Sequence, residues 1–422
     1  TTVTNFNKSE KYYTLSRIVA MNRQHCNYLI IGAGIIGLAL ARELRSHFPA
    51  ATIVVIEKEA DVAQHGSGRN SGVLHAGFYY TADSLKARFT RDGNRLLKEY
   101  VKQRGLAINE CHKVVVASDE SEIEGVRELQ RRGERNGVSV RIIDEQELAE
   151  IDPNARTTGI ALYSPSTATV DPAQVCHALK EDLEAVGVRF LFGQGYLRRE
   201  GQGAVVTTAG QVIEAGMIIN AAGLYADRVG RDYGFSQQYT IIPFKGIYLK
   251  YTGPDRPIRT NIYPVPNLKN PFLGVHYTVT VDGTIKIGPT AIPAFWRQNY
   301  VGLEHFNTQE LLEILGWEAR LFLGDNFGFR SLALSEIKKY NRSYFTGLAV
   351  KMVHRLDTAG FNQWSKPGIR AQLLNTSTKE LVQDFVVEGD HRSIHILNAV
   401  SPAFTCSFPF AAWVVEHYVL KQ

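Results

Sequence analysis

The chain has 422 residues, too long for one small hydrophobic core, so two domains are expected, and its 44% hydrophobic content is that of an ordinary globular protein. The net charge of +5 is mild and spread along the chain, so nucleic-acid binding is not indicated. The four cysteines are widely separated, which argues against a zinc site, an iron–sulfur cluster or a disulfide framework, and no metal is expected. No run of about 18 apolar residues predicts a membrane-spanning helix.

Residues 1–23 form a basic tail rich in Ser and Thr, with four Lys and Arg residues against the single acid Glu10. This composition suits the remainder of an organelle-targeting segment, and it suits an unstructured tail equally well.

Residues 27–57 have the order of a dinucleotide-binding unit, in which a strand, a glycine-rich turn, a helix and a second strand follow one another. Gly32 permits the tight turn, Gly34 lets the backbone approach a pyrophosphate, and Gly37 lets the helix pack closely on the strand. The helix N-terminus offers N–H groups and the positive end of its dipole to the phosphates. Glu57 ends the second strand and favours an unphosphorylated ribose, because a 2′-phosphate would meet like charge.

A second loop rich in small residues, 66–77, follows directly after Glu57. Glycine and serine at this density cannot build a core, but they can wrap backbone donors around an anionic ligand. A flexible surface loop is the alternative. The position after the ribose acid favours a second cofactor clamp.

The rest of the chain alternates between helical and strand-like segments. Helices are expected at 84–104, 120–136, 173–185 and 300–354, and from 401 to the C-terminus. Strands are expected at 114–117, 188–192, 204–208, 217–220, 246–251, 273–280, 284–287, 369–372, 384–387 and 394–398. Asp171 and Pro172 give the third helix a cap and a first-turn proline.

The pattern predicts two domains built from separated segments. The expected nucleotide-binding domain comprises 24–110, 150–236 and 362–422, and the expected substrate domain, an antiparallel sheet with a helical cap, comprises 111–149 and 237–361. The overall class is α/β, or α+β across both domains. The basic, aromatic region 300–354 is either a cap packed on the second domain or a membrane-docking surface.

Several motifs resemble one group of flavoproteins. They are Gly-Arg-Asn-Ser-Gly-Val-Leu-His-Ala-Gly-Phe-Tyr-Tyr (68–80), Ser-Leu-Lys-Ala (84–87), Pro-Phe-Lys-Gly (243–246), Tyr-Pro-Val-Pro (263–266), Pro-Phe-Leu-Gly-Val-His (271–276), Gly-Ile-Arg-Ala-Gln (368–372) and Asn-Ala-Val-Ser-Pro-Ala (398–403). The chain resembles the superfamily of D-amino-acid oxidase, glycine oxidase and glycerol-3-phosphate dehydrogenase, and within it the L-2-hydroxyglutarate dehydrogenase/oxidase family. The likeness covers nearly all of the chain from Tyr28 to the last helix.

The resemblance implies a Rossmann-like FAD-binding domain with non-covalent FAD. The residues that it implies for FAD are Gly32, Gly34, Ile36, Gly37, Glu57, Lys58, Arg69, Asn70, Ser71, Gly72, Ala222, Gly223, Ser401, Ala403 and Thr405. The helix start at Ser401 would direct N–H donors at the carbonyl edge of the flavin.

The implied reaction is the oxidation of a small 2-hydroxy dicarboxylic acid, L-2-hydroxyglutarate to 2-oxoglutarate. An amino-acid or amine oxidase, and a flavin-binding or membrane-docking subunit without a reaction, are the alternatives. An enzyme of this kind needs an electron acceptor, which could be a quinone, an electron-transfer flavoprotein or oxygen. The expected location is mitochondrial with peripheral contact to the inner membrane, or cytoplasmic if the source is bacterial.

Oxidation of a 2-hydroxy acid needs a base for the hydroxyl proton and a cation for the carboxylate. A base that titrates near neutrality is most simply a histidine. His276 is expected to be the base and His75 its orienting partner. Arg370 suits a bidentate carboxylate clamp, Lys245 is a second cationic candidate, and Tyr79 could donate a hydrogen bond.

Overall fold

The structure is a computed structural model that describes residues 23–82, 84–266 and 274–421. The expected basic tail lies almost wholly outside these residues, as does the start of the strand predicted from Leu273.

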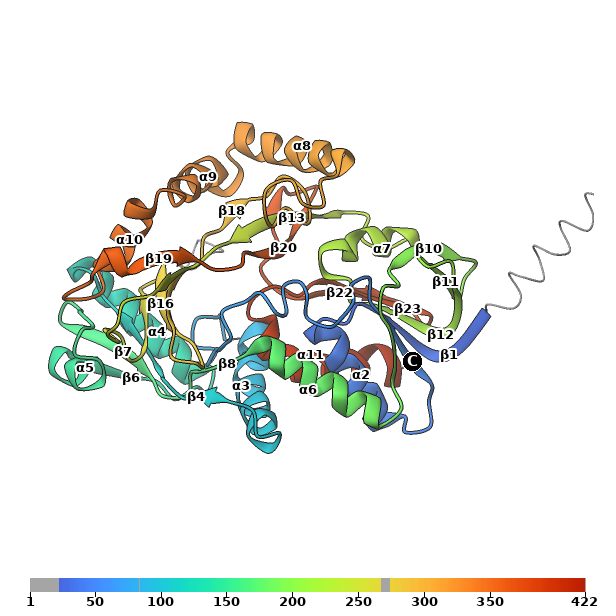
Figure 1. The fold of residues 1–422 in the computed structure, drawn as a ribbon, viewed down its shortest axis with the longest axis horizontal. Coiled ribbons are helices and arrows are strands. Elements are labelled where there is room, and N and C mark those ends of the chain that lie inside the picture. Colours follow the sequence, from blue (N-terminus) through green and yellow to red (C-terminus); the bar gives the residue numbers. More distant parts are fainter. Residues whose placement is uncertain (1–22, 83, 267–273, 422) are drawn as a thin grey trace, which may run out of the picture.

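A sheet with a parallel centre organises one half of the molecule (Figure 1). Its parallel strands lie in the order β9 (Arg189–Leu191), β2 (Ile53–Ile56), β1 (Arg23–Ile31), β12 (Val212–Asn220) and β23 (Ser393–Asn398). Antiparallel strands extend it, namely β10 (Tyr196–Glu200), β11 (Ala204–Thr207) and β22 (Val386–Gly389). Because β1 and β12 pair in parallel with Ile31 opposite Asn220, the turns that follow the two strands lie at the same edge.

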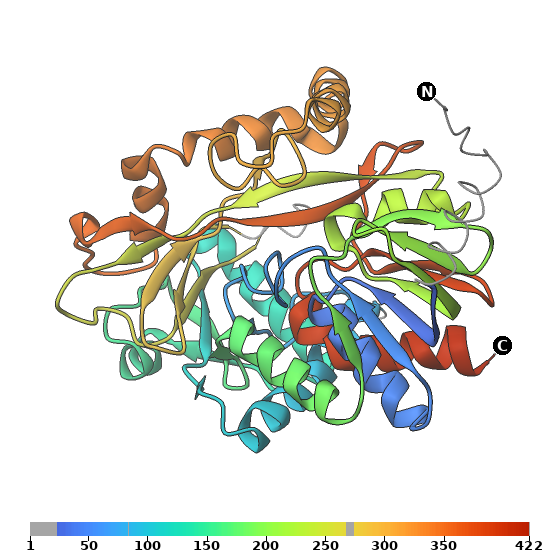
Figure 2. The same ribbon diagram turned by 45° about the vertical axis from the view of Figure 1, so that its right-hand side comes forward.

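Helices cover one face of this sheet and bury the largest hydrophobic core against it (Figures 1 and 2). They are α2 (Ile35–His47), α3 (Leu85–Gln103), α6 (Pro172–Ala185) and α11 (Ala403–Val415). The predicted start of α6 is confirmed, since the Asp171 carboxylate accepts hydrogen bonds from the N–H groups of Ala173 and Gln174. The short helices η2 (Gly223–Tyr225) and α7 (Ala226–Asp232) follow β12, and a π-helical turn, η5 (Glu416–Leu420), extends α11.

The other half contains mostly antiparallel sheets, as predicted. One sheet has the order β18 (Ile292–Pro293), β13 (Tyr239–Gly246), β20 (Gly368–Asn375), β21 (Glu380–Leu381), and a second has the order β16 (His276–Val279), β17 (Ile285–Gly288), β14 (Leu249–Tyr251), β19 (Phe361–Trp364). A third has the order β15 (Asn261–Pro264), β5 (Lys113–Val116), β7 (Ile160–Ser164), β6 (Arg141–Asp144), in which β15 and β5 are parallel. The chain passes between the two halves through a small sheet, which consists of β3 (Val73–Leu74), β8 (Ala168–Val170) and β4 (Ile108–Asn109).

Three helices form a cap on the outer side of this half, where two of them pack on the β13–β20 sheet and the third packs on the second sheet (Figure 2). They are α8 (Thr308–Gly324), α9 (Phe329–Lys338) and α10 (Arg342–Val350). The helical stretch predicted from 300 therefore begins later, at the cap residue Asn307. Two further helices, α4 (Ile123–Arg135) and α5 (Glu145–Ile151), pack on the third sheet. Within the described residues, no helix has the length and apolar character that spanning a membrane requires.

The bounds of one predicted strand were wrong, and two strands that contain a proline, β13 and β15, were not predicted. The strand expected at 246–251 is divided into β13, which ends at Gly246, and β14, which begins at Leu249. Strand β13 was not predicted, because Pro243 lies inside it. β18 pairs only with Phe244 and Lys245, so the sheet is open on that side of the proline. The Pro-rich segment 263–266 begins as the end of the edge strand β15, which tolerates a terminal proline.

Strand pairing places two segments in a different domain from the one expected from the sequence. Residues 160–164, expected in the nucleotide-binding domain, form β7 and pair with β5 and β6. Residues 368–375, also expected there, form β20 and pair with β13. The division into two domains remains a proposal, with these strands moved to the second one.

Candidate active site

A cavity of about 690 Å³ lies at the carboxyl ends of β1, β2 and β12, below β13 and β20. Turns after the three parallel strands line one side, and residues of β13, β20 and the start of α11 line the rest. Ligands of open α/β sheets bind at this edge, where the strand order reverses. The volume is in the range of pockets that hold a large organic ligand.

The glycine turn has the geometry that the sequence predicts. Gly32 has a φ of +108°, and a Cβ there would lie 2.6 Å from the carbonyl oxygen of Ala221. A Cβ on Gly37 would lie 2.0 Å from the carbonyl oxygen of Gly32, so only glycine lets α2 approach the turn this closely. A Cβ on Gly34 would lie 2.9 Å from Ser67 Oγ, which accepts a hydrogen bond of 2.8 Å from the Ile35 N–H.

Two helix N-termini meet this cavity. The first turn of α2, including Ile36, and the first turn of α11, including Ala403 and Thr405, both line it. Neither first turn contains an acidic residue, and neither helix has a side-chain cap among the described residues. Both ends therefore present positive dipole ends and N–H groups to an anionic or electron-rich ligand.

Glu57 lies at the end of β2 and is held toward the glycine turn. One carboxylate oxygen accepts from the Ala33 N–H at 2.8 Å and the other from the Glu59 N–H at 3.0 Å. The carboxylate lines the cavity and keeps acceptor capacity for a ribose hydroxyl. The neighbouring Lys58 also lines the cavity, and its ammonium contacts Glu59, His65 and Gln298.

The second loop is a rigid turn rather than a flexible one. Asn70 donates to the carbonyl oxygens of Gly66 at 3.1 Å and Ser67 at 2.8 Å, and it accepts from the Gly72 N–H at 2.8 Å. Arg69 donates to the Gln64 carbonyl oxygen at 2.7 Å. Its guanidinium also stacks 4.3 Å from the centre of the Tyr300 ring. This ordered backbone fits the predicted cofactor clamp.

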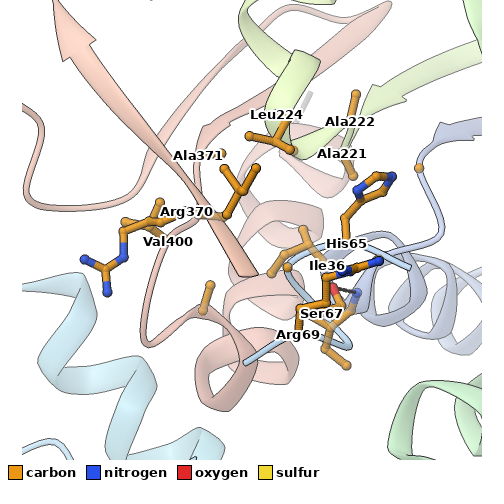
Figure 3. Close-up of a pocket in the computed structure, with 18 of the residues that line it drawn as sticks. Ile36, His65, Ser67, Arg69, Ala221, Ala222, Leu224, Arg370, Ala371 and Val400 are labelled. Atoms are coloured by element: carbon orange, nitrogen blue, oxygen red, sulfur yellow. Dashed lines mark hydrogen bonds between the residues drawn. The ribbon is translucent and has the colours of Figure 1, made fainter. Parts of the chain in front are cut away.

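Arg370 lies at the opposite end of the cavity from His65 and Ala222 (Figure 3). It is partly buried and faces the rings of Tyr80 and Tyr248 and the carboxylate of Glu336; burial lowers the pKa of its guanidinium. The buried Lys86 of α3 lies close enough to Arg370 to feel its charge, and burial lowers the Lys86 pKa to about 8. The carboxylate of Asp384 also acts on Lys86, and Arg370 is the cation of this group that lines the cavity.

Lys245 faces away from Arg370 because of strand register. Phe244, which lines the cavity, pairs directly with Arg370 across β13 and β20, so the two side chains share a face. The next residue, Lys245, points to the other face and donates to Asn299 Oδ1 at 3.3 Å. Burial lowers the pKa of Lys245.

The two predicted histidines lie near each other but are placed differently. His75 lines the cavity, and its backbone N–H donates to Thr405 Oγ1 at 3.2 Å. His276 stacks on Tyr263 with ring centres 3.7 Å apart, and its Nδ1 lies 2.8 Å from the carbonyl oxygen of Gly274. Since a carbonyl only accepts, Nδ1 of His276 carries the proton. Burial lowers the pKa of His276 to about 3, and burial with Lys113 and His276 nearby holds the pKa of His75 well below 6.5.

Most of the predicted site residues come together. Those that line the cavity are Gly32, Gly34, Ile36, Glu57, Lys58, Arg69, Asn70, Ser71, His75, Ala222, Gly223, Arg370, Ser401, Ala403 and Thr405. Within the described part of the chain, five others do not line it, namely Gly37, Gly72, Tyr79, Lys245 and His276. Gly37 and Gly72 support the turns, since a Cβ at Gly72 would lie 2.2 Å from the carbonyl oxygen of Val170. Tyr79 is buried, and its hydroxyl has no partner among the described residues.

Sequence reasoning missed several residues around the site. His65 lines the cavity, and its Nδ1 lies 2.8 Å from the Tyr300 hydroxyl. Gln298 lines it from a distant segment and donates to the Tyr225 hydroxyl at 2.8 Å. The position of His65 directly before the second glycine loop was a usable signal. Gln298 had none, because only the tertiary fold brings it to the cavity.

The residues present fit a dinucleotide cofactor such as FAD. The glycine cradle, the Glu57 acceptor and the α2 N-terminus match a pyrophosphate and its ribose. The α11 N-terminus lies at the same cavity, where an electron-rich ring could use its N–H groups. Within the described residues, no group of three or more His, Cys, Asp and Glu side chains could hold a metal ion.

Comparisons with known proteins agree with this geometry. Residues 27–416 match the family model described as FAD dependent oxidoreductase. The chain is 36% identical to an L-2-hydroxyglutarate dehydrogenase of Escherichia coli (strain K12), covering 92% of each chain. It is 33% identical to a mitochondrial L-2-hydroxyglutarate dehydrogenase of Bos taurus, covering 92% of this chain and 87% of that one.

A solved structure shows the same fold. An L-alpha-glycerophosphate oxidase from Mycoplasma pneumoniae with FAD bound superposes with a TM-score of 0.74, at 20% identity, over 94% of this chain and 95% of that chain. The two enzymes matched by sequence are a bacterial protein and a mitochondrial protein. The family model covers almost the entire described chain, and the cavity presents the cofactor cradle that the family requires. The chain belongs to the FAD dependent oxidoreductase family and is a flavoprotein oxidoreductase that uses FAD.

Proposed function

We propose that the protein oxidises L-2-hydroxyglutarate to 2-oxoglutarate with FAD. The observation that carries this proposal is the 36% identity, over 92% of both chains, to an L-2-hydroxyglutarate dehydrogenase. The cavity supports it, because the guanidinium of Arg370 at one end suits an anionic substrate and the opposite end suits a dinucleotide. Bound FAD supplies the acceptor for the hydride that leaves C2 of the substrate.

His75 is the better candidate for the base, contrary to the preference for His276 drawn from the sequence. His75 lines the cavity, whereas His276 lies behind it, stacked on Tyr263 and hydrogen-bonded to the Gly274 carbonyl oxygen. In the proposed reaction the substrate hydroxyl gives its proton to His75.

Arg370 binds one carboxylate of the substrate as a charge-assisted fork. The second carboxylate adds a further negative charge, which Lys86 beside Arg370 can balance. Tyr248 lines this end of the cavity, and Tyr80 lies close enough to Arg370 to affect its pKa. Burial raises the pKa of both hydroxyls, so they stay neutral, and the Tyr248 hydroxyl can donate a hydrogen bond to a carboxylate or ketone oxygen.

Anaerobic addition of substrate tests the activity directly. L-2-Hydroxyglutarate is expected to bleach the flavin absorbance, and 2-oxoglutarate should appear in one-to-one ratio. D-2-Hydroxyglutarate, glycine and D-alanine serve as controls. Bleaching by an amino acid and not by the hydroxy acid would assign the protein to the amino-acid oxidases; no bleaching by any of them would leave only a flavin-binding role. Acid precipitation should release the flavin, because all four cysteines are buried and none lines the cavity among the described residues.

We also propose that the cap touches a membrane surface. Large apolar side chains are exposed along α8 and α9, including Leu312 at 68%, Leu323 at 78% and Ile337 at 53%. Arg320, Arg330 and Lys338 on the same helices are also exposed. An apolar surface with basic residues suits peripheral binding to anionic lipid. In a mitochondrion this surface would face the inner membrane.

A membrane contact favours a quinone as the electron acceptor over an electron-transfer flavoprotein or oxygen. Reoxidation of the substrate-reduced protein by a soluble quinone analogue, by an electron-transfer flavoprotein and by air, followed by stopped-flow absorbance, ranks the three. Fastest reoxidation by air would make the protein an oxidase and remove the quinone proposal.

A further inference from the structure

Lys113, at the start of β5, is a buried lysine without an acidic partner. Its side chain has 0% exposure, and no carboxylate pairs with it within the described residues. Its ammonium nitrogen lies 3.9 Å from the centre of the Tyr263 ring and 5.3 Å from that of Tyr79. Within the part of the chain that the structure describes, its one polar contact is Nδ1 of His75, at 3.4 Å.

Such surroundings disfavour a charged lysine. Removing an ammonium group from water costs more free energy than the faces of aromatic rings return to the desolvated cation. Burial accordingly lowers the pKa of Lys113 to about 7, with only a small opposing effect of Cys111. Near neutral pH a large fraction of Lys113 is therefore an uncharged amine, which can accept a hydrogen bond.

The charge of Lys113 decides which nitrogen of His75 carries the proton. An ammonium group only donates, so it would require a bare Nδ1 and leave the proton on Nε2. A neutral amine can accept from Nδ1–H, which leaves Nε2 with a free lone pair. Only the second arrangement makes Nε2 a base.

We propose that Lys113 is a positioning residue that sets the tautomer of His75, accepting Nδ1–H as a neutral amine so that Nε2 can take the hydroxyl proton of the substrate. The inference rests on the proposed function of His75 as the base. In the step, the hydroxyl O–H bond breaks and its proton joins Nε2, while C2 loses a hydride and the C–O bond becomes C=O. The imidazolium that forms keeps its Nδ1–H directed at the neutral amine, which avoids two positive charges in contact.

The arrangement has a pH signature. Among the described residues, the titratable groups that face Lys113 are His75, His276, Tyr79, Tyr263 and Cys111, and burial keeps the histidines, the tyrosines and the thiol neutral near pH 7. Lys113 is thus the group of this cluster that changes charge there. The rate of flavin reduction should rise with pH as Lys113 loses its proton, and it should fall below pH 7 as the ammonium form returns.

Two substitutions at Lys113 separate this role from a structural or purely electrostatic one. Lys113→Arg keeps a permanent charge that cannot accept, so it should slow anaerobic flavin reduction at least about 100-fold, the scale of a lost general base. Lys113→Met removes the charge and leaves His75 free to adopt either tautomer, so the rate of flavin reduction should fall about tenfold or less. The rise of this rate with pH near pH 7 should disappear. FAD content and the dissociation constant of 2-oxoglutarate should change little in either variant. Lys286→Arg and Lys286→Met, at a partly buried lysine of β17 outside the cavity, are the matched controls.

A spectroscopic measurement gives an answer that is independent of turnover. In protein labelled with ¹⁵N-histidine and assigned with His75→Gln, His75 should show its proton on Nδ1 above pH 7 in the wild type and on Nε2 in Lys113→Arg. If Lys113→Arg reduces its flavin faster than Lys113→Met, a charged residue at position 113 supports the reaction, and the proposal is overturned. If His75→Gln keeps the wild-type rate, the assignment of the base fails instead, whatever Lys113 does. If His75→Gln is slow but the two Lys113 variants behave alike, only the tautomer role is lost.

Discussion

Replacing Arg370 by alanine tests the substrate end of the cavity. Arg370 projects into the cavity from β20, away from the cofactor cradle, and its removal leaves a substrate carboxylate without its fork. Truncating one partner of a buried charge pair typically costs 2–5 kcal/mol. Since Arg370 is only partly buried, we expect a loss of about 2–4 kcal/mol of binding free energy, which raises the dissociation constant roughly 30- to 900-fold. Arg370→Lys should fall between wild type and alanine, because lysine keeps the charge and loses the planar fork.

The measurement is a titration of the oxidised protein with 2-oxoglutarate, followed by the flavin spectrum, so that binding is separated from chemistry. Lys245→Ala is the matched control, a cation one register step away that points to the opposite face and contacts Asn299. It should change the dissociation constant less than threefold. An Arg370→Ala protein that binds within threefold of wild type, or a Lys245→Ala protein that loses as much as Arg370→Ala, would refute the placement.

Three further predictions concern the cofactor, the base and the cap. Gly37→Ala sets a Cβ 2.0 Å from the Gly32 carbonyl oxygen and should lower the FAD content and the melting temperature, measured by flavin absorbance and circular dichroism. His75→Gln should slow anaerobic flavin reduction by about 10²–10⁴-fold and abolish the acid limb that belongs to His75. Because the His75 pKa is depressed, the base is lost only as pH falls through a value below 6.5, and stopped-flow reduction across pH locates that limb. Leu323→Glu with Ile337→Glu should weaken co-sedimentation with anionic vesicles, and high salt should weaken the wild-type binding, whereas unchanged sedimentation would contradict the membrane contact.

Local features of the chain were predictable wherever backbone conformation decides the structure. Gly32, Gly34 and Gly37 with Glu57 at a fixed distance specified a turn, a helix start and an acceptor, and the structure contains all of them. Asp171 specified the start of α6 in the same way. Each of these signals depends on residues a few positions apart, whose preferences act before any distant part of the chain is in place.

The substrate end depended on register and on packing. Lys245 and Arg370 were both reasonable carboxylate ligands in the sequence, and the pairing of β13 with β20 placed them on opposite faces, with only Arg370 of the two lining the cavity. His75 and His276 were likewise equal candidates until the fold put one at the cavity and the other behind it.

Lys113 is the clearest case of a residue whose role could not be predicted from the sequence. A lysine at the start of a strand ordinarily reaches solvent, and nothing nearby in the sequence indicates otherwise. Two segments distant from it in the chain, one with His75 and Tyr79 and the other with Tyr263, surround its ammonium group and leave it 0% exposed. The sequence by itself determined the cofactor cradle, because short-range backbone preferences encode it. The tertiary structure decided which side chains are desolvated, since burial is the sum of contacts from distant segments, and desolvation is what turns a surface cation into a group that titrates near neutral pH.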